Sequence, residues 1–182
     1  MIGVVLSGCL LGYAQEACVE RSVWGIQGDL LSVWGYNESR LSDVVALRCE
    51  AGLRGNFFYS YSNIFGGYSR YAIIPELSVE PRWYYNLAWR QAKDRPTAHN
   101  SANYFSLKTT FYPEWLVVGD AHILPANMLT VIPMWGIRRH YGTHFSLEAG
   151  AGAGYQHIFG QMNAWRRDKF VIGWHCRIGY TF

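Results

Sequence analysis

Residues 170–182 read Phe-Val-Ile-Gly-Trp-His-Cys-Arg-Ile-Gly-Tyr-Thr-Phe, and every second residue from Phe170 to Phe182 is apolar or aromatic. The residues between them include Gly173, His175 and Arg177. Because successive side chains of a strand point to opposite faces, this alternation predicts a long β-strand with one apolar face and one polar face.

Six earlier segments alternate in the same way, although the first of them does so weakly and the fifth is interrupted by the apolar residues Ile132 and Met134. Several segments keep the pattern for more than ten residues, whereas strands of soluble proteins usually have about 5–6. A strand that crosses a lipid bilayer needs about 9–11 residues. The six segments are Val23–Tyr36, Val44–Phe57, Ile73–Tyr85, Asn103–Tyr112, Leu129–Arg139 and Phe145–Phe159.

These segments predict an all-β protein with one antiparallel up-and-down transmembrane β-barrel. Bacterial barrels of this type have an even number of strands, so we expect eight strands although only seven segments are located. Either the missing strand lies within residues 1–22, or the chain is truncated, or the strands are miscounted. In Val23–Tyr36 the expected apolar face carries Trp24, Ile26, Leu30, Trp34 and Tyr36.

Aromatic residues ten positions apart on the apolar faces provide a check of length. The pairs are Trp24 with Trp34, Phe145 with Tyr155, and Phe170 with Tyr180. Ten residues of a strand tilted near 45° rise about 23 Å, close to the ~25 Å apolar band that aromatic girdles border in membrane barrels.

The composition of the chain fits a membrane barrel and also a soluble β-sandwich. Of the 182 residues, 16% are charged and 16% are aromatic, against about 25% charged residues in an average soluble domain. No apolar run reaches the roughly 20 residues of a transmembrane helix. The basic residues are scattered, so the net charge of +3 indicates no nucleic-acid partner.

The polar faces decide between these two folds, because they carry charges of both signs with Arg more frequent than Lys. Arginine is favoured where its planar guanidinium pairs with carboxylates away from water. The inward glycines Gly150, Gly152 and Gly154 are expected to leave room for large Arg or Tyr side chains from across the barrel. Together these features predict a charge network inside a narrow barrel. Its expected members are Arg48, Glu50, Arg54, Glu76, Glu80, Arg82, Lys108, Arg138, Glu148 and Arg177, with Asp29 on the same face.

The first fourteen residues are expected to be a secretory signal peptide, and residues 15–182 the barrel. Ile2–Leu11 is apolar, and Gly12 and Ala14 are small residues at the positions required for cleavage before Gln15. The sequence Leu6-Ser7-Gly8-Cys9 leaves lipidation at Cys9 as an alternative.

The chain resembles small bacterial barrels of the "outer membrane protein β-barrel domain" kind over residues 23–182. The resemblance rests on residues 80–86 (Glu-Pro-Arg-Trp-Tyr-Tyr-Asn), 103–108 (Asn-Tyr-Phe-Ser-Leu-Lys) and 135–139 (Trp-Gly-Ile-Arg-Arg). The final Ile178, Tyr180 and Phe182 resemble the terminal signal that the barrel assembly machinery recognises. The resemblance implies a location in the bacterial outer membrane, with lipid and the assembly machinery as partners. It implies no catalytic residues.

Two regions are expected to lie outside the lipid. The segment Tyr59–Tyr71 contains four tyrosines that either contact sugars or proteins from a loop or form an interfacial belt above the membrane. The segment Gly160–Lys169 is the second expected outer loop. The candidate contact residues are Tyr59, Tyr61, Tyr68, Tyr71, Trp165 and Arg166.

One stretch of the sequence is similar to a catalytic arrangement. His144-Phe145-Ser146 resembles the His-x-Ser pair of the outer-membrane lipid A deacylase, with Glu148 nearby. The alternation directs His144, Ser146 and Glu148 inward, so a polar lumen with a histidine at the turn is the favoured interpretation. No metal site and no cofactor are expected.

The sequence therefore predicts a non-enzymatic outer-membrane protein with a structural or adhesive role, or one that acts as an accessory subunit in a complex with a protein partner. A narrow transporter for a small or apolar ligand is the main alternative, and a deacylase-like esterase is the third.

Overall fold

The computed structural model describes residues 18–62, 66–119, 126–160 and 168–182, and the side chains of residues 57–70 lie outside that description. Almost all regular structure is β-strand. The strands are β1 (Ser22–Gly28), β2 (Ser32–Arg40), β3 (Val45–Ser62), β4 (Gly66–Trp83), β5 (Asn103–Tyr112), β6 (Val118–Gly119), β7 (Met128–Tyr141), β8 (Phe145–Ile158) and β9 (Asp168–Thr181). The short helices are α1 (Leu87–Gln91), η1 (Ala98–Asn100) and η2 (Glu114–Leu116).

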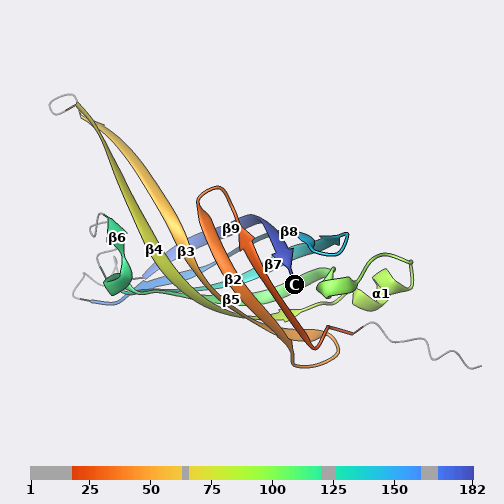
Figure 1. Ribbon diagram of the computed structural model, residues 1–182. Helices are drawn as coiled ribbons and strands as arrows, with labels where there is room; N and C mark the ends of the chain where they lie inside the picture. The colour runs from red at the N-terminus through yellow and green to blue at the C-terminus, as the bar shows by residue number, and fades with distance from the viewer. Residues whose placement is uncertain (1–17, 63–65, 120–125, 161–167) are drawn as a thin grey trace, which may run out of the picture.

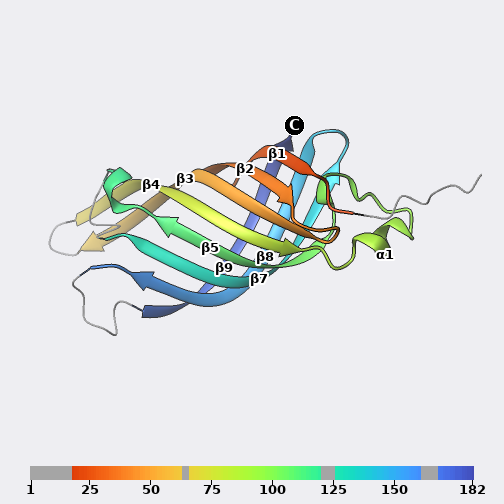
Figure 2. The same ribbon diagram turned by 90° about the horizontal axis from the view of Figure 1, so that it is seen from below.

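Eight of these strands form a closed antiparallel up-and-down barrel (Figures 1 and 2). Neighbours in the chain are neighbours in the barrel, β9 pairs with β1, and the pairing of β3 with β4 completes the ring. The two-residue strand β6 stands outside the ring and pairs with Ala72 and Ile73 of β4. The all-β barrel expected from the alternation is confirmed.

The two faces of the wall follow the alternation in the sequence. In β4, Leu77, Val79 and Trp83 point outward and are about half exposed, whereas Glu76 and Glu80 point inward and are buried. Ile132 and Met134, which break the pattern in β7, are inward residues. The Ile132 side chain lies against Gly173 of β9, two strands away, and the Met134 side chain lies against Gly152 of the adjacent β8.

The first predicted segment, Val23–Tyr36, is wrong as a single strand because it contains the β1–β2 hairpin. The amide of Asp29 donates to the carbonyl of Ser32 at 3.0 Å, and the Asp29 carboxylate accepts from the amide of Leu31 at 3.0 Å. Aspartate favours such turns because its side chain bonds to the backbone two residues ahead. The hairpin supplies the eighth strand.

The turn also changes which residues of this segment face inward. Trp34 and Tyr36 lie inside the barrel, 1% and 3% exposed, instead of on the outer face with Trp24. The spacing of ten residues from Trp24 to Trp34 is therefore no check of the length of a membrane-spanning strand. The other two aromatic pairs do lie on the outer face. Asp29 lies exposed in the turn and not on the inward face.

The β3–β4 hairpin is longer than predicted. Its strands continue to Ser62 and from Gly66, so the backbone of Tyr59, Tyr61, Tyr68 and Tyr71 belongs to strands and not to a loop. Figure 1 shows this hairpin projecting far beyond the rest of the wall.

An even number of strands brings both ends of the barrel chain to one end of the molecule, which we call the base. The base carries α1 and η1, the connection 41–44 and the connection 142–144 (Figure 2). The opposite end, which carries the β3–β4 turn, is called the rim. At the base, the connection between β4 and β5 packs under the barrel in a small apolar cluster, whose members are Val19, Ala46, Tyr84, Leu87, Ala102 and Tyr104.

Within the described ranges, no helix combines the length and the apolar character that crossing a membrane requires.

Candidate functional site

The interior of the barrel is charged, and its charged side chains are almost completely shielded from solvent. Five carboxylates lie there, together with four arginines that are at most 1% exposed and with Lys108, which is 8% exposed. The carboxylates are Glu38, Glu50, Glu76, Glu80 and Glu148, and the arginines are Arg48, Arg82, Arg138 and Arg177. We call this set, with the half-buried Arg54, the ion cluster.

The structure brings together all ten residues that the sequence places in the lumen. They come from β3, β4, β5, β7, β8 and β9, so the arrangement exists only when the barrel is closed. Each of the ten takes part in an ion pair with another member of the ion cluster.

Glu148 is the centre of the cluster. Its carboxylate accepts two hydrogen bonds from Arg82, from Nη1 to Oε2 at 3.0 Å and from Nη2 to Oε1 at 2.7 Å. Arg48 donates to Oε2 at 3.2 Å, and the hydroxyl of Tyr104 donates to Oε1 at 3.1 Å. Two-pronged guanidinium–carboxylate pairs fix the relative orientation of both groups.

Glu50 forms a second centre on β3. Oε1 accepts from Arg48 at 2.7 Å and from Arg177 at 2.9 Å, while Oε2 accepts from Lys108 at 2.8 Å and from Ser78 at 3.0 Å. Three cations around one carboxylate connect β3, β5 and β9. The pair of Arg82 with Glu80, 2.8 Å apart, adds β4.

Glu38 is the centre nearest the base, and the sequence prediction missed it. Arg138 donates to Oε2 at 2.9 Å, and the hydroxyl of Tyr84 donates to Oε1 at 2.7 Å. The side-chain amide of Asn100 donates to the same Oε1. The prediction missed Glu38 because Val23–Tyr36 was read as one strand, so the phase of β2 was lost.

The cluster ends toward the rim at Glu76. Its carboxylate accepts from the indole nitrogen of Trp34 and from Nε of Arg54, the latter at 2.8 Å. The Arg54 side chain is 38% exposed, so solvent reaches this pair far more than the other pairs of the ion cluster.

Three aromatic rings hold guanidinium groups in place from one side. Arg48 lies 3.8 Å from the ring centre of Tyr36, Arg82 lies 4.2 Å from that of Tyr104, and Arg177 lies 4.0 Å from that of Trp34. A cation over an aromatic face is attracted by the ring electrons, more strongly where water is excluded.

The other side of each ring lies on a glycine of the adjacent strand. Tyr36 covers Gly25, Trp34 covers Gly52, and Tyr104 covers Gly136, and in each case the two residues are direct partners in the ladder. These glycines admit rings from the neighbouring strand, because a ring lying flat on the wall occupies the space of a Cβ. At Gly150, Gly152 and Gly154, where the sequence predicted Arg or Tyr side chains from across the barrel, the atoms nearest to the Cβ position belong instead to the adjacent strands β7 and β9.

This arrangement closes the barrel interior at the level of Glu148. Charges of both signs nearly balance, and their side chains have no solvent contact. The Nε atoms of Arg82, Arg138 and Arg177 have no hydrogen-bond partner among the described residues. A buried pair gains little over apolar packing, but the loss of one member leaves an expensive unpaired charge.

The base is closed by the connection that precedes β5. His99 and Asn100 both have left-handed backbone angles, with φ of 50° and 60°. Asn100 is buried, its side-chain oxygen accepts a hydrogen bond from the backbone amide of Glu20, and its side-chain nitrogen donates one to Glu38.

In the same connection Arg90 donates to the carbonyl of Pro96 at 2.9 Å, and burial together with Arg95 lowers the pKa of Arg90.

The residues considered for catalysis do not form an exposed site. Ser146 is buried, and its Oγ has no hydrogen-bond partner among the described residues. Glu148 is engaged in the ion cluster. His144 lies at the base, where Nδ1 is 2.8 Å from the carbonyl oxygen of Thr181.

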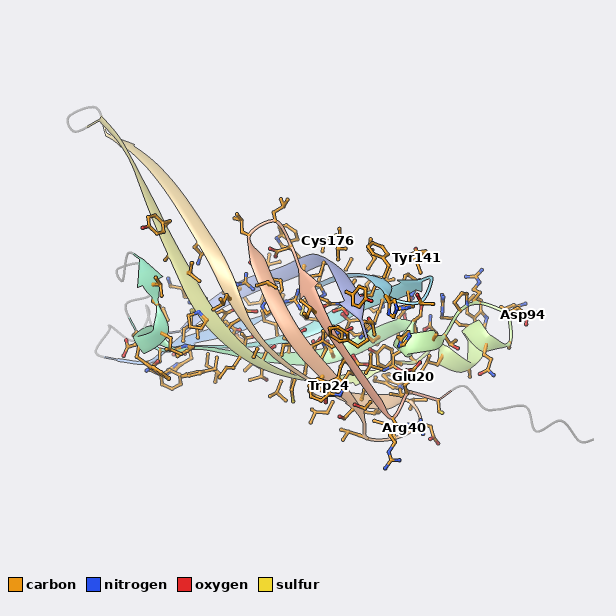
Figure 3. All side chains as sticks on the ribbon, in the orientation of Figure 1. Glu20, Trp24, Arg40, Asp94, Tyr141 and Cys176 are labelled. Carbon is orange, nitrogen blue, oxygen red and sulfur yellow. The ribbon has the colours of Figure 1, made fainter. Side chains whose placement is uncertain are left out.

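The outer face of the wall is apolar. Ile178, Tyr180 and Phe182 point outward and are between 50% and 67% exposed. The side chains of Trp24 and Tyr141 also project away from the barrel interior (Figure 3). A shallow apolar groove of about 1020 Å³ crosses the outer face of β1 to β5, with Trp24 and Phe182 at one side, Leu77 and Phe111 at the other, and Cys49 among its lining residues.

Of the residues considered as surface contacts, Tyr71 is 65% exposed on the outer part of β4. The side chains of Tyr59, Tyr61 and Tyr68 lie outside the described residues, as do Trp165 and Arg166, the signal segment 1–14 and Cys9. The described part of the chain contains no group of three or more residues suited to hold a metal ion.

Comparison of the chain with protein-family models, with curated proteins and with solved structures gave no match.

Proposed function

We propose that this protein is a β-barrel of the bacterial outer membrane that spans the lipid, catalyses no reaction, and has a structural or adhesive role or acts as an accessory subunit of a complex. The observation that carries the proposal is the reversed distribution of polarity. Charged side chains fill the interior, while large apolar side chains such as Trp83, Ile172 and Trp174 are 51–77% exposed on the outer face. Water would favour the opposite arrangement, whereas lipid favours this one.

Two aromatic bands support this placement. Phe145 pairs with Tyr180 near the base, and Tyr155 pairs with Phe170 ten residues farther along both strands. All four rings are 45–68% exposed. At a tilt near 45°, ten residues separate the bands by about 23 Å, close to the ~25 Å apolar band of membrane barrels.

The last strand, β9, indicates which end of the barrel faces the periplasm. The outward residues Ile178, Tyr180 and Phe182 suit recognition by the barrel assembly machinery, which would leave the base in the periplasm. The long β3–β4 hairpin and Tyr71 would then face the outside of the cell, where adhesive contacts are made.

The ion cluster supports a closed barrel over a general pore. An eight-stranded barrel leaves an interior that side chains can just fill, and here charged and aromatic side chains occupy it. Its buried pairs connect most strands of the wall, so they specify how the barrel closes.

The test is to express the chain with a complete signal peptide, isolate outer membranes, and compare its mobility in SDS gels before and after boiling. We expect a band in the membrane fraction that shifts on heating, because closed barrels resist SDS until heated. A band in the soluble periplasmic fraction that does not shift would refute the proposal. Steady single-channel conductance of the wild-type protein would refute its closed form.

A further inference from the structure

The wall of the barrel has a notch where the β1–β2 hairpin stops. β1 pairs with β9 only from Ile178 to Thr181, and β2 pairs with β3 only as far as Arg54. Figure 1 shows the hairpin ending well short of the β3–β4 hairpin. We call the opening above Asp29–Leu31 the notch.

Both sides of the notch are free strand edges. From Asp168 to Arg177, β9 pairs with β8 on one side, and no described residue pairs with the other side. From Asn56 to Ser62, β3 pairs with β4 and lacks a described partner on the side of β2. The backbone groups along both edges are therefore left without ladder partners.

The two edges are in register along the strands. The ladder connects Ile178 to Gly28, Gly28 to Val33, and Val33 to Leu53. Residues beyond Ile178 toward the rim therefore continue the ladder positions of residues beyond Leu53. At the floor of the notch two strands lie between the edges, which separates the edges there by three strand spacings or about 14 Å.

Lipid cannot fill such an opening. In the proposed placement, the free edge of β9 runs from the middle of the membrane to the outer aromatic band at Phe170. Backbone N–H and C=O groups in the lipid core must find hydrogen-bond partners within protein. The floor of the notch carries the exposed carboxylate of Asp29, which lipid also does not solvate.

The outer side chains of the notch also lack cover. Leu30 is 100% exposed and Leu31 64% exposed at the hairpin tip, and Ile172 and Trp174 on the β9 edge are 76% and 77% exposed. These values are among the highest of the large apolar side chains of the described wall. An occupant must therefore offer both apolar side chains and backbone hydrogen bonds.

We propose that the notch receives a β-hairpin of a partner polypeptide, whose two strands pair with β9 and β3 and complete the wall toward the rim. Strand addition to a free edge is an established mode of recognition, in which main-chain bonds give affinity and alternate side chains give specificity. Two strands fit the width of the notch at its floor, and they can pair with the ten residues Asp168–Arg177 of β9 and the seven residues Asn56–Ser62 of β3. This inference rests on the proposed membrane placement and specifies the partner of the accessory role.

The experiment places a photoreactive residue at the notch in the native host. The variants Trp174→p-benzoylphenylalanine and Leu30→p-benzoylphenylalanine probe the side and the floor. Phe105→p-benzoylphenylalanine is the control, because Phe105 is 49% exposed on the outer face but has paired strands on both sides. After irradiation, the cross-linked peptides are identified by mass spectrometry.

We expect both notch variants to cross-link to two adjacent strand segments of one other polypeptide, and the control to give lipid adducts only. Lipid adducts at all three positions would overturn the inference, and so would adducts to a second copy of this chain, which would mean that β9 and β3 of different copies pair. If the control gives no lipid adducts, the membrane placement itself fails, which keeps the two failures distinguishable.

Hydrogen exchange gives a second readout that does not depend on cross-linking. In the isolated protein in lipid nanodiscs, we expect the open-side amides of Asp168–Arg177 to exchange at least tenfold faster than those of Ile178–Thr181. Copurification with the cross-linked partner should slow them to the rate of the paired segment. Equal rates in the isolated protein would show that the edge is already covered and would overturn the inference.

Discussion

The ring of Tyr104 on β5 lies flat against Gly136, its direct partner on β7. Its opposite face carries the guanidinium of Arg82, and its hydroxyl donates to Glu148 at 3.1 Å. A glycine in the wall therefore determines where a charged group in the lumen sits. The same order of glycine, ring and guanidinium recurs at Gly25, Tyr36 and Arg48, and at Gly52, Trp34 and Arg177.

The substitution Gly136→Ala should destabilise the barrel, because the added methyl group would overlap the ring of Tyr104. The ring cannot swing away freely, since Arg82 and Glu148 hold its far side. We expect the free energy of unfolding to fall by about 1–3 kcal/mol, as for other overpacked sites. Urea titration of the heat-shifted band measures this change.

Gly35→Ala is the matched control, because Gly35 also lies in a strand but its Cβ would meet no atom closer than 4.0 Å. We expect its stability to stay within about 0.5 kcal/mol of wild type. Equal effects of the two substitutions would show that the contact between Tyr104 and Gly136 does not matter.

The substitution Arg82→Ala should destabilise the protein strongly, because it removes the one guanidinium that pairs with both Glu148 and Glu80 in a site without solvent contact. Removal of one member of a buried ion pair costs about 3–5 kcal/mol. It should also let ions pass through the barrel interior beside Glu148, which would be measured as an increase of single-channel conductance in planar bilayers.

Arg54→Ala is the corresponding control, since the Arg54 side chain is 38% exposed. Solvent screening limits the loss there to about 1 kcal/mol or less. If Arg82→Ala changes neither unfolding nor conductance, the ion cluster neither stabilises nor closes the barrel.

Two substitutions of Asn100 separate the contributions of its backbone conformation and of its side chain to the free energy of unfolding. Asn100→Gly keeps a residue that tolerates a φ of 60° but removes the amide contacts with Glu38 and Glu20. We expect a loss of about 1–2 kcal/mol from the missing hydrogen bonds. Asn100→Ala should lose about 1 kcal/mol more, because alanine is strained in this conformation. A more stable alanine variant than glycine variant, in urea unfolding, would contradict this account.

The native thiols test the membrane placement. Cys49 and Cys176 are exposed on the outer face, so lipid should cover them in outer membranes. In a Cys18→Ser background, an apolar maleimide should modify both, while a charged maleimide should react at least ten times more slowly. Asp43→Cys at the exposed base turn should react with both reagents. Fast reaction of Cys49 with the charged reagent would mean that the outer face meets water.

Alternation along the sequence was sufficient to predict most of the strands and the direction of their side chains. Alternation in residues 170–182 separates Arg177 and His175 from Trp174 and Ile178 without reference to any other strand, because a strand has a period of two residues. The same rule directed the ten charged residues of the lumen inward, and an even strand count required the eighth strand before it was located.

The turn at Asp29, the register and the closure of the ring depend on contacts between strands, so they are known only from the tertiary structure. The turn at Asp29 set the phase of β2 and brought Glu38 into the ion cluster, since its hydrogen bonds interrupt an otherwise apolar run. The register placed Tyr104 opposite Gly136, and closure of the ring brought Arg82 of β4 to Glu148 of β8, 66 residues away. The length mismatch between β1–β2 and their neighbours created the notch. These features depend on how strands align, and alternation along one strand contains no information on alignment.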